Sequence, residues 1–379
     1  MTTPTKLQAV RKLLGYSADA VMTMLIKRAD MLGEPIMTRT SLKTKLSRWE
    51  NGHEPVSSPT YRRLFRDIYG RTNEELGFPP EVEDDEASEL RLRLASASQV
   101  DSATVEIFRR QVDHARHVDR RFGGITLLDQ LRSQIEQVGN LLQYGTGRGH
   151  REGLASVLVE ASTLAGWESL DRNAINQAWV HYQRAKAAAR EAGSVGLLAH
   201  ATAEQAFVLI DVGETASALD QLAEARALAD DVATPLLRAW LAAAHGEGYA
   251  AAGQRDNAVQ AFDEADALLP ADPVDPLLPF VFLGGSHLAR WRGNALARLG
   301  DPEAVDHLTR ALPRLPPEFI RARVGMLVDL AFAHAAAGER DAAQSYAREA
   351  KRLGQQIRSD RHLRRLAQLT FPASKSRTA

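Results

Sequence analysis

The sequence predicts an all-α protein in which a small amino-terminal helical bundle precedes a long array of helical hairpins. Two observations predict this fold. Five short segments with helical apolar periodicity fill the first 78 residues, and most end at or near a glycine. From about residue 150 onward, a pattern of paired alanines recurs at intervals close to 40 residues. A repeat of that length is typical of an α-solenoid, in which each hairpin packs on its neighbours.

The bulk composition indicates a soluble protein of more than one domain. The chain has 379 residues and no cysteine, so disulfides and thiolate chemistry are excluded. Its start has no apolar core of signal-peptide length, and no segment approaches about 18 uninterrupted apolar residues. We therefore expect a cytoplasmic protein without a membrane partner.

Charge is distributed unevenly along the chain. Residues 1–80 carry 13 Lys/Arg and 8 Asp/Glu, whereas the remainder carries 34 and 40. A basic small domain joined to an acidic large one indicates that only the first faces a polyanion. The stretch FPPEVEDDEASE favours a linker, although a solvated acidic run would have the same charges. The predicted organisation is a bundle at 1–78, a linker at 79–89, connecting helices at 90–150, repeats at 151–370 and a disordered tail at 371–379.

The alanine pattern defines five predicted hairpins. Each copy has two alanines seven positions apart with a bulky residue between them, and most copies follow a glycine-containing helix stop. The first alanines are Ala178, Ala218, Ala258, Ala304 and Ala343, at intervals of 40, 40, 46 and 39. A spacing of seven keeps both alanines on one helical face, where small side chains allow a neighbouring helix to approach closely.

The clearest copy resembles a tetratricopeptide repeat. In AAHGEGYAAAGQRDNAVQAFDEADALL, the matching positions are Gly246, Tyr249, Gly253, Ala258, Phe262 and Ala265. The spacing exceeds the family's usual ~34 residues. The resemblance implies that the first helix of each pair lines a concave surface. The resemblance then places the following residues on the concave surface: Trp167, Phe207, Trp240, Glu247, His287, Arg290, Asn294 and Phe332.

Two interpretations of the inward residues remain open. Aromatic side chains beside Arg, Asn and Glu suit a peptide or an amphipathic small molecule as ligand. Trp and Phe at helical spacing are also common in hydrophobic cores, and Glu–Arg pairs are common on solvated surfaces.

No motif indicates an enzyme, a metal site or a cofactor. HARH places His114 and His117 on one helix, but no further ligand stands at a suitable spacing. GTGRGHREG at 145–153 follows a helix and lacks the Lys-Ser/Thr ending of a phosphate loop, so we interpret it as a helix connection. We expect two further helices around residues 103–124 and 126–142. They connect the bundle to the array, cap the array or form a dimer contact.

The segment SLKTKLSRWENG separates apolar from basic residues. Leu42, Leu46 and Trp49 fall at i, i+4 and i+7 and predict a buried stripe. The polar side carries Lys43, Thr44, Lys45, Ser47 and Arg48. A helix that enters a DNA major groove needs this division, because its basic and hydroxyl side chains must reach base edges and phosphates. An amphipathic surface helix is the alternative.

Together with YRRLFRDIYGRTNEELGF, this segment resembles the helix-turn-helix of the Cro/repressor family. More specifically, the chain resembles actinobacterial regulators that join this domain to tetratricopeptide repeats. The resemblance implies binding to double-stranded DNA as a homodimer, and repeats that sense an effector. By position it implies DNA contacts for Lys43, Thr44, Lys45 and Arg48, a core role for Trp49, and structural roles for Glu50 and Gly52.

Two features depart from the family pattern. The link KRADMLGEPIMTR is expected to be about ten residues longer than the usual tight turn, and Ala18 replaces the polar residue that contacts phosphate. These departures keep a second hypothesis open, a repeat-based protein-interaction adaptor with a degenerate helix-turn-helix. The first prediction is a sequence-specific transcriptional regulator that responds to a peptide, a small molecule or a protein.

Overall fold

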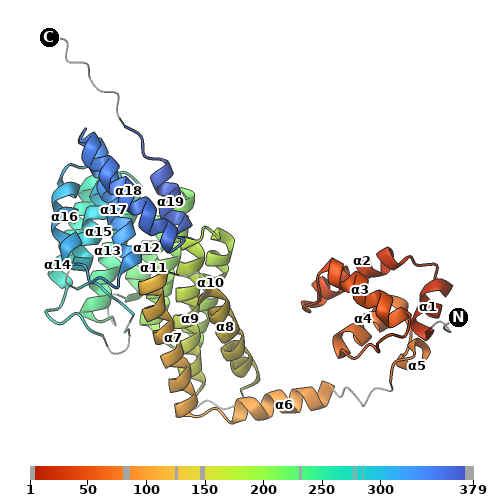
Figure 1. The fold of residues 1–379 in the computed structure, drawn as a ribbon. Coiled ribbons are helices and arrows are strands. Elements are labelled where there is room, and N and C mark those ends of the chain that lie inside the picture. Colours follow the sequence, from red (N-terminus) through yellow and green to blue (C-terminus); the bar gives the residue numbers. More distant parts are fainter. Residues whose placement is uncertain are drawn as a thin grey trace. The chain divides into compact units, whose positions relative to one another are not determined.

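A computed structural model describes residues 5–79, 86–123, 127–145, 150–229, 233–275, 278, 280–284 and 286–371 (Figure 1). Within these residues the protein is all-α, as predicted: it forms helices α1 to α19 and one short 3-10 helix, with no β-strand. The chain divides into two compact units, residues 1–91 and residues 92–379.

The first unit contains five helices. They are α1 (Lys6–Leu13), α2 (Ala18–Leu32), α3 (Arg39–Glu50), α4 (Pro59–Tyr69) and α5 (Asn73–Leu76). Thr5, Ser17 and Thr72 cap α1, α2 and α5 through side-chain hydrogen bonds. The cap of α3 is Thr38, which accepts a hydrogen bond from the Ser41 backbone N–H.

The core of this unit lies between α2, α3 and α4, which contact one another in the pairs α2–α3 and α2–α4. Its fully buried side chains include Leu25, Leu42, Leu64 and Phe65. The expected long link between the second and third helices is shorter than predicted. Because α2 continues to Leu32, only residues 33–38 lie between the two helices.

The second unit begins within α6 (Glu86–Ser98). The next helices are α7 (Ser102–Phe122), α8 (Leu127–Tyr144), α9 (Arg151–Asp171), α10 (Ile175–Glu191), α11 (Val195–Val212), α12 (Thr215–Ala229) and α13 (Pro235–Ala251). They are followed by α14 (Arg255–Leu268), α15 (Ser286–Leu299), α16 (Glu303–Ala311), α17 (Ile320–Ala336), α18 (Arg340–Gln356) and α19 (Asp360–Ala367). The 3-10 helix is Leu312–Arg314, directly after α16. From α9 onward, each helix packs against the next.

The repeated alanines lie on the contact faces between helices. Both alanines of all five copies are buried, with no side chain more than 2% exposed. The facing helix contributes glycine at matching positions. A Cβ at Gly246 of α13 would lie 2.7 Å from the Phe262 ring of α14, and one at Gly166 of α9 would lie 2.9 Å from the Tyr182 ring of α10. In these two hairpins the glycine lets the two helices close around one bulky side chain.

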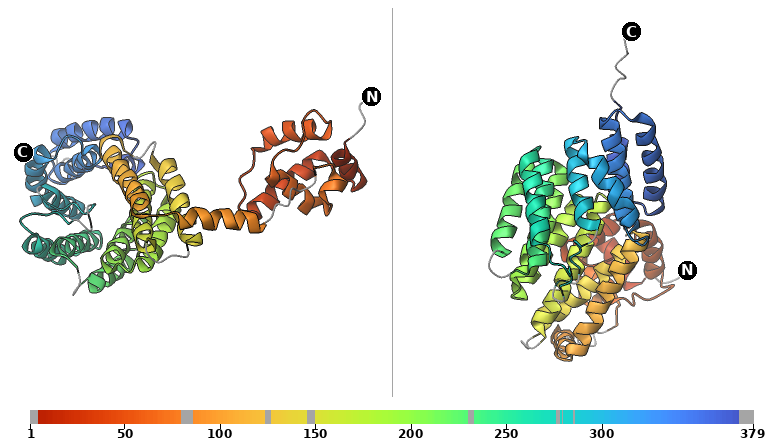
Figure 2. Two further views of the ribbon diagram at one scale, coloured as in Figure 1. Left: turned by 90° about the horizontal axis from the view of Figure 1, so that it is seen from below. Right: turned by 90° about the vertical axis from the view of Figure 1, so that its left-hand side faces the viewer.

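The helical array curves until its last helices reach its first ones. α17 contacts α7, and α19 contacts α9 (Figure 2). Arg321 of α17 holds this closure, since its guanidinium pairs with Asp119 of α7 and with two carboxylates of α9, Glu168 at 2.8 Å and Asp171 at 3.2 Å. Arg321 and Asp119 are 202 positions apart in the chain.

Parts of the predicted boundaries lie outside the described residues. These are residues 80–85 of the predicted linker, 146–149 of the glycine-rich connection and 372–379 of the predicted tail. Residues 86–89 of the predicted linker belong to α6. Among the described helices, α11 is long and apolar enough to cross a membrane, but 56% of that stretch is buried inside the unit, which is also typical of a core helix.

Candidate functional site

The apolar side of α3 is packed into the first unit. Leu42, Leu46 and Trp49 are buried. The Trp49 ring lies 5.0 Å from the Tyr61 ring and 5.9 Å from the Phe65 ring, measured between centroids. These contacts fix the rotation of α3 about its axis, so its opposite side faces solvent.

The five residues predicted to contact DNA lie on that solvent side. Lys43, Thr44, Ser47 and Arg48 are exposed, and Lys45 is partly exposed. Lys43 forms no ion pair with any part of the chain that the structure describes. The structure therefore brings the predicted basic and hydroxyl groups together on one accessible helix face.

A carboxylate that the sequence interpretation missed lies beside this face. Glu54 follows the left-handed Gly52 and returns toward α3, where its Oε1 is 2.8 Å from Lys45 Nζ and its Oε2 is 3.7 Å from Arg48 Nε. The hydrogen bond from Lys45, together with the positive charge of Arg48, lowers the pKa of Glu54. Two of the three predicted DNA-contacting cations are thus paired within the protein.

A second candidate site is a cavity of about 310 Å³ inside the second unit. Seven of the eight residues that the repeat resemblance directs inward line it: Trp167, Phe207, Trp240, Glu247, His287, Arg290 and Asn294. They come from α9, α11, α13 and α15, and the same cavity also receives side chains from α7, α17 and α19. Phe332 lies instead at an adjoining depression near Arg364 and Gln368, which shares Arg298 and Arg361 with the cavity.

Aromatic rings form two walls of the cavity. On one wall the Trp240 and Trp291 rings lie 5.6 Å apart, and Phe207 lies 6.1 Å from Trp291. The other wall is made by Phe282 and Phe319, whose ring centroids are 6.2 Å apart. Such walls suit a flat apolar ligand group, because stacked or edge-on ring contacts stabilise it beyond the burial of its area.

Most arginines at the cavity are already paired. Arg116 binds Glu160 at 2.8 Å, Arg365 binds Asp329 at 2.7 Å, and Arg321 holds the three carboxylates of the closure. Arg361 makes two hydrogen bonds of 2.7 Å to the Asp211 carboxylate. These pairs stabilise the array and leave little charge for a ligand.

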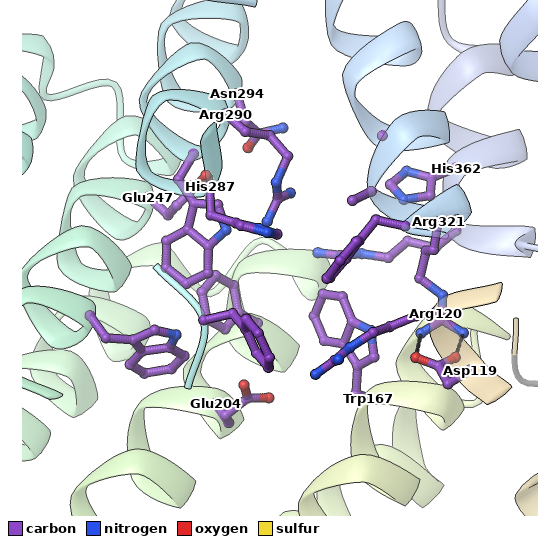
Figure 3. A pocket seen from close by; sticks show the side chains of 18 of the residues that line it. Asp119, Arg120, Trp167, Glu204, Glu247, His287, Arg290, Asn294, Arg321 and His362 are labelled. Atoms are coloured by element: carbon purple, nitrogen blue, oxygen red, sulfur yellow. Dashed lines mark hydrogen bonds and ion pairs between the residues drawn. The ribbon is translucent and has the colours of Figure 1, made fainter. Parts of the chain in front are cut away.

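A smaller group of polar side chains at the cavity lacks such partners. In Figure 3, Arg290 and Glu247 lie on one side of the cavity, and Arg120 extends from the other. Within the part of the chain that the structure describes, Arg290 and Glu247 form no ion pair, and the buried Nε of Arg290 has no hydrogen-bond partner. Arg120 lies over the Phe282 ring, with 4.1 Å between its Cζ and the ring centroid.

Burial shifts the ionisation of the cavity side chains. It raises the pKa of Glu247 to about 7, although Arg298 and Arg290 oppose the shift. It also raises the pKa of Glu204 to about 7, against the hydrogen bond from Tyr182. Burial lowers the pKa of His287 to about 4, so its imidazole is neutral at pH 7. Perturbed carboxyl groups inside a concave pocket are typical of functional sites.

Sequence reasoning missed the connector between α14 and α15. Phe280 and Phe282 of this connector line the cavity. A signal was available, because the interval from Ala258 to Ala304 is 46 residues where its neighbours are 40 and 39. The residues contributed by α7 and α19 carried no comparable signal, because the curvature of the array brings them to the cavity.

Among the residues that the structure describes, no group of three or more His, Asp or Glu side chains is placed to hold a metal ion. His114 and His117 are both exposed on α7, and His117 Nδ1 lies 2.8 Å from the Asp113 carbonyl oxygen. The two histidines and the cavity are therefore separate features.

Neither a comparison with protein-family models nor one with curated proteins finds a match for this chain.

Proposed function

We propose that the protein is a sequence-specific DNA-binding transcriptional regulator, with a helix-turn-helix in its first unit and a tetratricopeptide-like effector-binding array in its second. The observation that carries the proposal is the division of α3 into two sides. Leu42, Leu46 and Trp49 anchor the helix, while its exposed side presents Lys43, Thr44 and Arg48. An anchored helix with projecting basic and hydroxyl groups has what groove recognition requires.

We expect the protein to act in the cytoplasm as a homodimer, because specific recognition of DNA sequence favours a dimer. One small helix-turn-helix contacts too few base pairs to select a site, whereas a dimer reads two half-sites about 10 base pairs apart or a multiple of that spacing. Light scattering on the free chain and on its DNA complex tests this part. A monomer in both states would exclude the dimer.

The pairing of Glu54 with Lys45 and Arg48 favours a second candidate function. A carboxylate beside the recognition face weakens its attraction for phosphates, as expected if the bundle has lost DNA binding. In that case the protein is a repeat-based adaptor, and the cavity-bearing array alone carries its function.

Selection of bound fragments from random DNA, followed by titration of variants, separates the two functions. Arg48→Ala should cost about 1–3 kcal/mol on the selected site and relax specificity at one position of each half-site, as for a bidentate guanine contact. Lys43→Ala, as a phosphate contact, should weaken selected and scrambled DNA alike and make the salt dependence shallower.

Two further variants serve as controls. Lys12→Ala removes an exposed lysine of α1 rather than of α3, and should bind like the parent. Trp49→Ala should lose about 3–5 kcal/mol of folding stability through the cavity it leaves. Circular dichroism distinguishes that loss from a loss of contacts. If Lys43→Ala and Arg48→Ala both fold and bind like the parent, α3 does not read DNA and the adaptor function is favoured.

A further inference from the structure

Arg290 is a buried-cavity cation for which the described residues supply no paired carboxylate. It projects from α15 into the cavity (Figure 3), its Nε is buried without a hydrogen-bond partner, and it pairs with no carboxylate of the described residues. Burial lowers its pKa, although the nearby Glu247 and Asp329 oppose that shift. An unpaired guanidinium in such a site is costly to maintain. It would gain more from an incoming anion than the paired arginines around it.

The neighbouring carboxylates do not satisfy Arg290. Asp329 already binds Arg365 at 2.7 Å and accepts a hydrogen bond of 2.7 Å from Asn294. Glu247 is buried and forms no ion pair with Arg290, and with a pKa of about 7 it is only partly ionised at neutral pH. The cavity therefore keeps a positive centre at Arg290.

An aromatic surface adjoins this positive centre. The Arg290 Cζ lies 6.0 Å from the centre of the Trp291 ring, and Trp291 continues the wall formed with Trp240 and Phe207. A molecule with one acidic group and one flat apolar body could satisfy both features at once. The volume of about 310 Å³ is at the small end of cavities that hold organic ligands.

We propose that the cavity binds a small aromatic organic acid, with its carboxylate on Arg290 and its ring system against Trp291, Trp240 and Phe207. A cationic ligand is the opposite possibility, and Glu247 and Glu204 would then hold its ammonium group. The anion is favoured because the buried Nε of Arg290 has no hydrogen-bond partner among the described residues, whereas Glu204 already accepts a hydrogen bond of 2.9 Å from Tyr182. This inference rests on the effector-sensing part of the proposed function and is independent of DNA binding.

Three naphthalene probes of matched shape test the inference by isothermal titration calorimetry on the full chain. They are naphthalene-2-carboxylate, the neutral naphthalene-2-carboxamide and the cationic naphthalen-2-ylmethylammonium. The carboxylate should bind at least ~10-fold more tightly than the carboxamide, the size expected of a hydrogen bond to a charged group. The ammonium probe should bind most weakly.

Two variants on the same helix locate the site. Arg290→Gln should weaken carboxylate binding ~10- to 100-fold and leave carboxamide binding unchanged. Arg292→Gln is the matched control, because Arg292 pairs with Asp263 at 2.7 Å and does not line the cavity, so both probes should bind it as they bind the parent. Thermal unfolding followed by circular dichroism confirms that the variants are folded.

Three results would overturn the inference: tighter binding of the ammonium probe, equal effects of the two arginine substitutions, or no measurable binding of the carboxylate. The DNA selection described above is performed without any probe. If the chain binds selected DNA but does not bind the carboxylate probe, only the proposed ligand class is rejected. If the chain binds the carboxylate probe but selects no DNA, only the proposed DNA-binding function is rejected.

Discussion

Arg11 of α1 and Glu50 at the end of α3 form a two-contact ion pair, with Nε–Oε1 at 2.6 Å and Nη2–Oε2 at 2.8 Å. Arg11 also donates a hydrogen bond of 2.9 Å to the Tyr16 carbonyl, so it ties the end of α3 to the turn after α1. The Glu50 side chain is only 5% exposed. The pair holds the carboxyl-terminal end of the proposed recognition helix against the first helix.

Removing one member of this pair should destabilise the first unit. Glu50→Ala leaves Arg11 without its partner in a largely buried position, and we expect a loss of about 3 kcal/mol in the free energy of unfolding. Chemical denaturation followed by circular dichroism measures it. The double variant Arg11→Met with Glu50→Leu replaces the pair by apolar contacts and should recover most of the loss. A single variant as stable as the parent would contradict a structural role for Glu50.

Neutralising Glu54 should strengthen DNA binding if α3 reads DNA. Glu54→Gln removes the carboxylate that pairs with Lys45 and Arg48. We expect a gain of ~2- to 10-fold in affinity and a steeper salt dependence, because two more cations are free to contact phosphates. Fluorescence anisotropy at several salt concentrations measures both quantities.

The control for Glu54 is Glu74→Gln, which removes an exposed carboxylate from α5 and changes the net charge equally. It should produce only the small gain expected from net charge. Equal gains from both variants would mean that the position beside α3 has no special role.

Loss of the Arg321 guanidinium should open the closure of the array. Arg321→Met leaves Asp119, Glu168 and Asp171 close together without their shared cation, and we expect a loss of about 3–5 kcal/mol. Hydrogen exchange should show reduced protection first in α17 and α19. Arg323→Met, next to it on α17 but paired with Glu349 on α18, is the control and should leave α7 and α9 protected as before. Unchanged exchange in Arg321→Met would show that the closure does not depend on this residue.

Glu247 should make the stability of the second unit depend on pH. Its pKa is raised from 4.5 to about 7 in the folded state, so the folded chain binds more protons than the unfolded chain between these values. This contribution is fully present below pH 4.5, decreases as the pH rises and is lost above about pH 7. Arg290, Arg298 and Arg365 oppose the shift, and Asp329 adds to it.

Glu247→Gln should therefore flatten the pH dependence of unfolding between pH 4.5 and pH 7 by roughly 2–3 kcal/mol. Urea denaturation at a series of pH values measures it. Glu214→Gln, an exposed position after α11, serves as control and should keep the slope of the parent. Equal slopes in Glu247→Gln and the parent would show that Glu247 is ionised throughout this range.

The sequence alone determined the all-α fold and the buried faces of several helices. These features depend on local information. Helical periodicity places Leu42, Leu46 and Trp49 on one face of a helix, and the alanine spacing places Ala258 and Ala265 on another. The repeat resemblance directs eight residues inward, and seven of them line one cavity, whereas Phe332 does not.

Only the tertiary structure decided how distant residues meet. The closure through Arg321 depends on the total curvature of the array, which is the sum of small rotations between successive helices and has no signature in any one repeat. For the same reason, Arg120 of α7 and Arg361 of α19 reach a cavity that is also lined by residues of α9, α11, α13, α15 and α17. Glu54 pairs with Lys45 and Arg48 because the chain reverses at Gly52, and a sequence pattern does not give the direction of a chain after a turn.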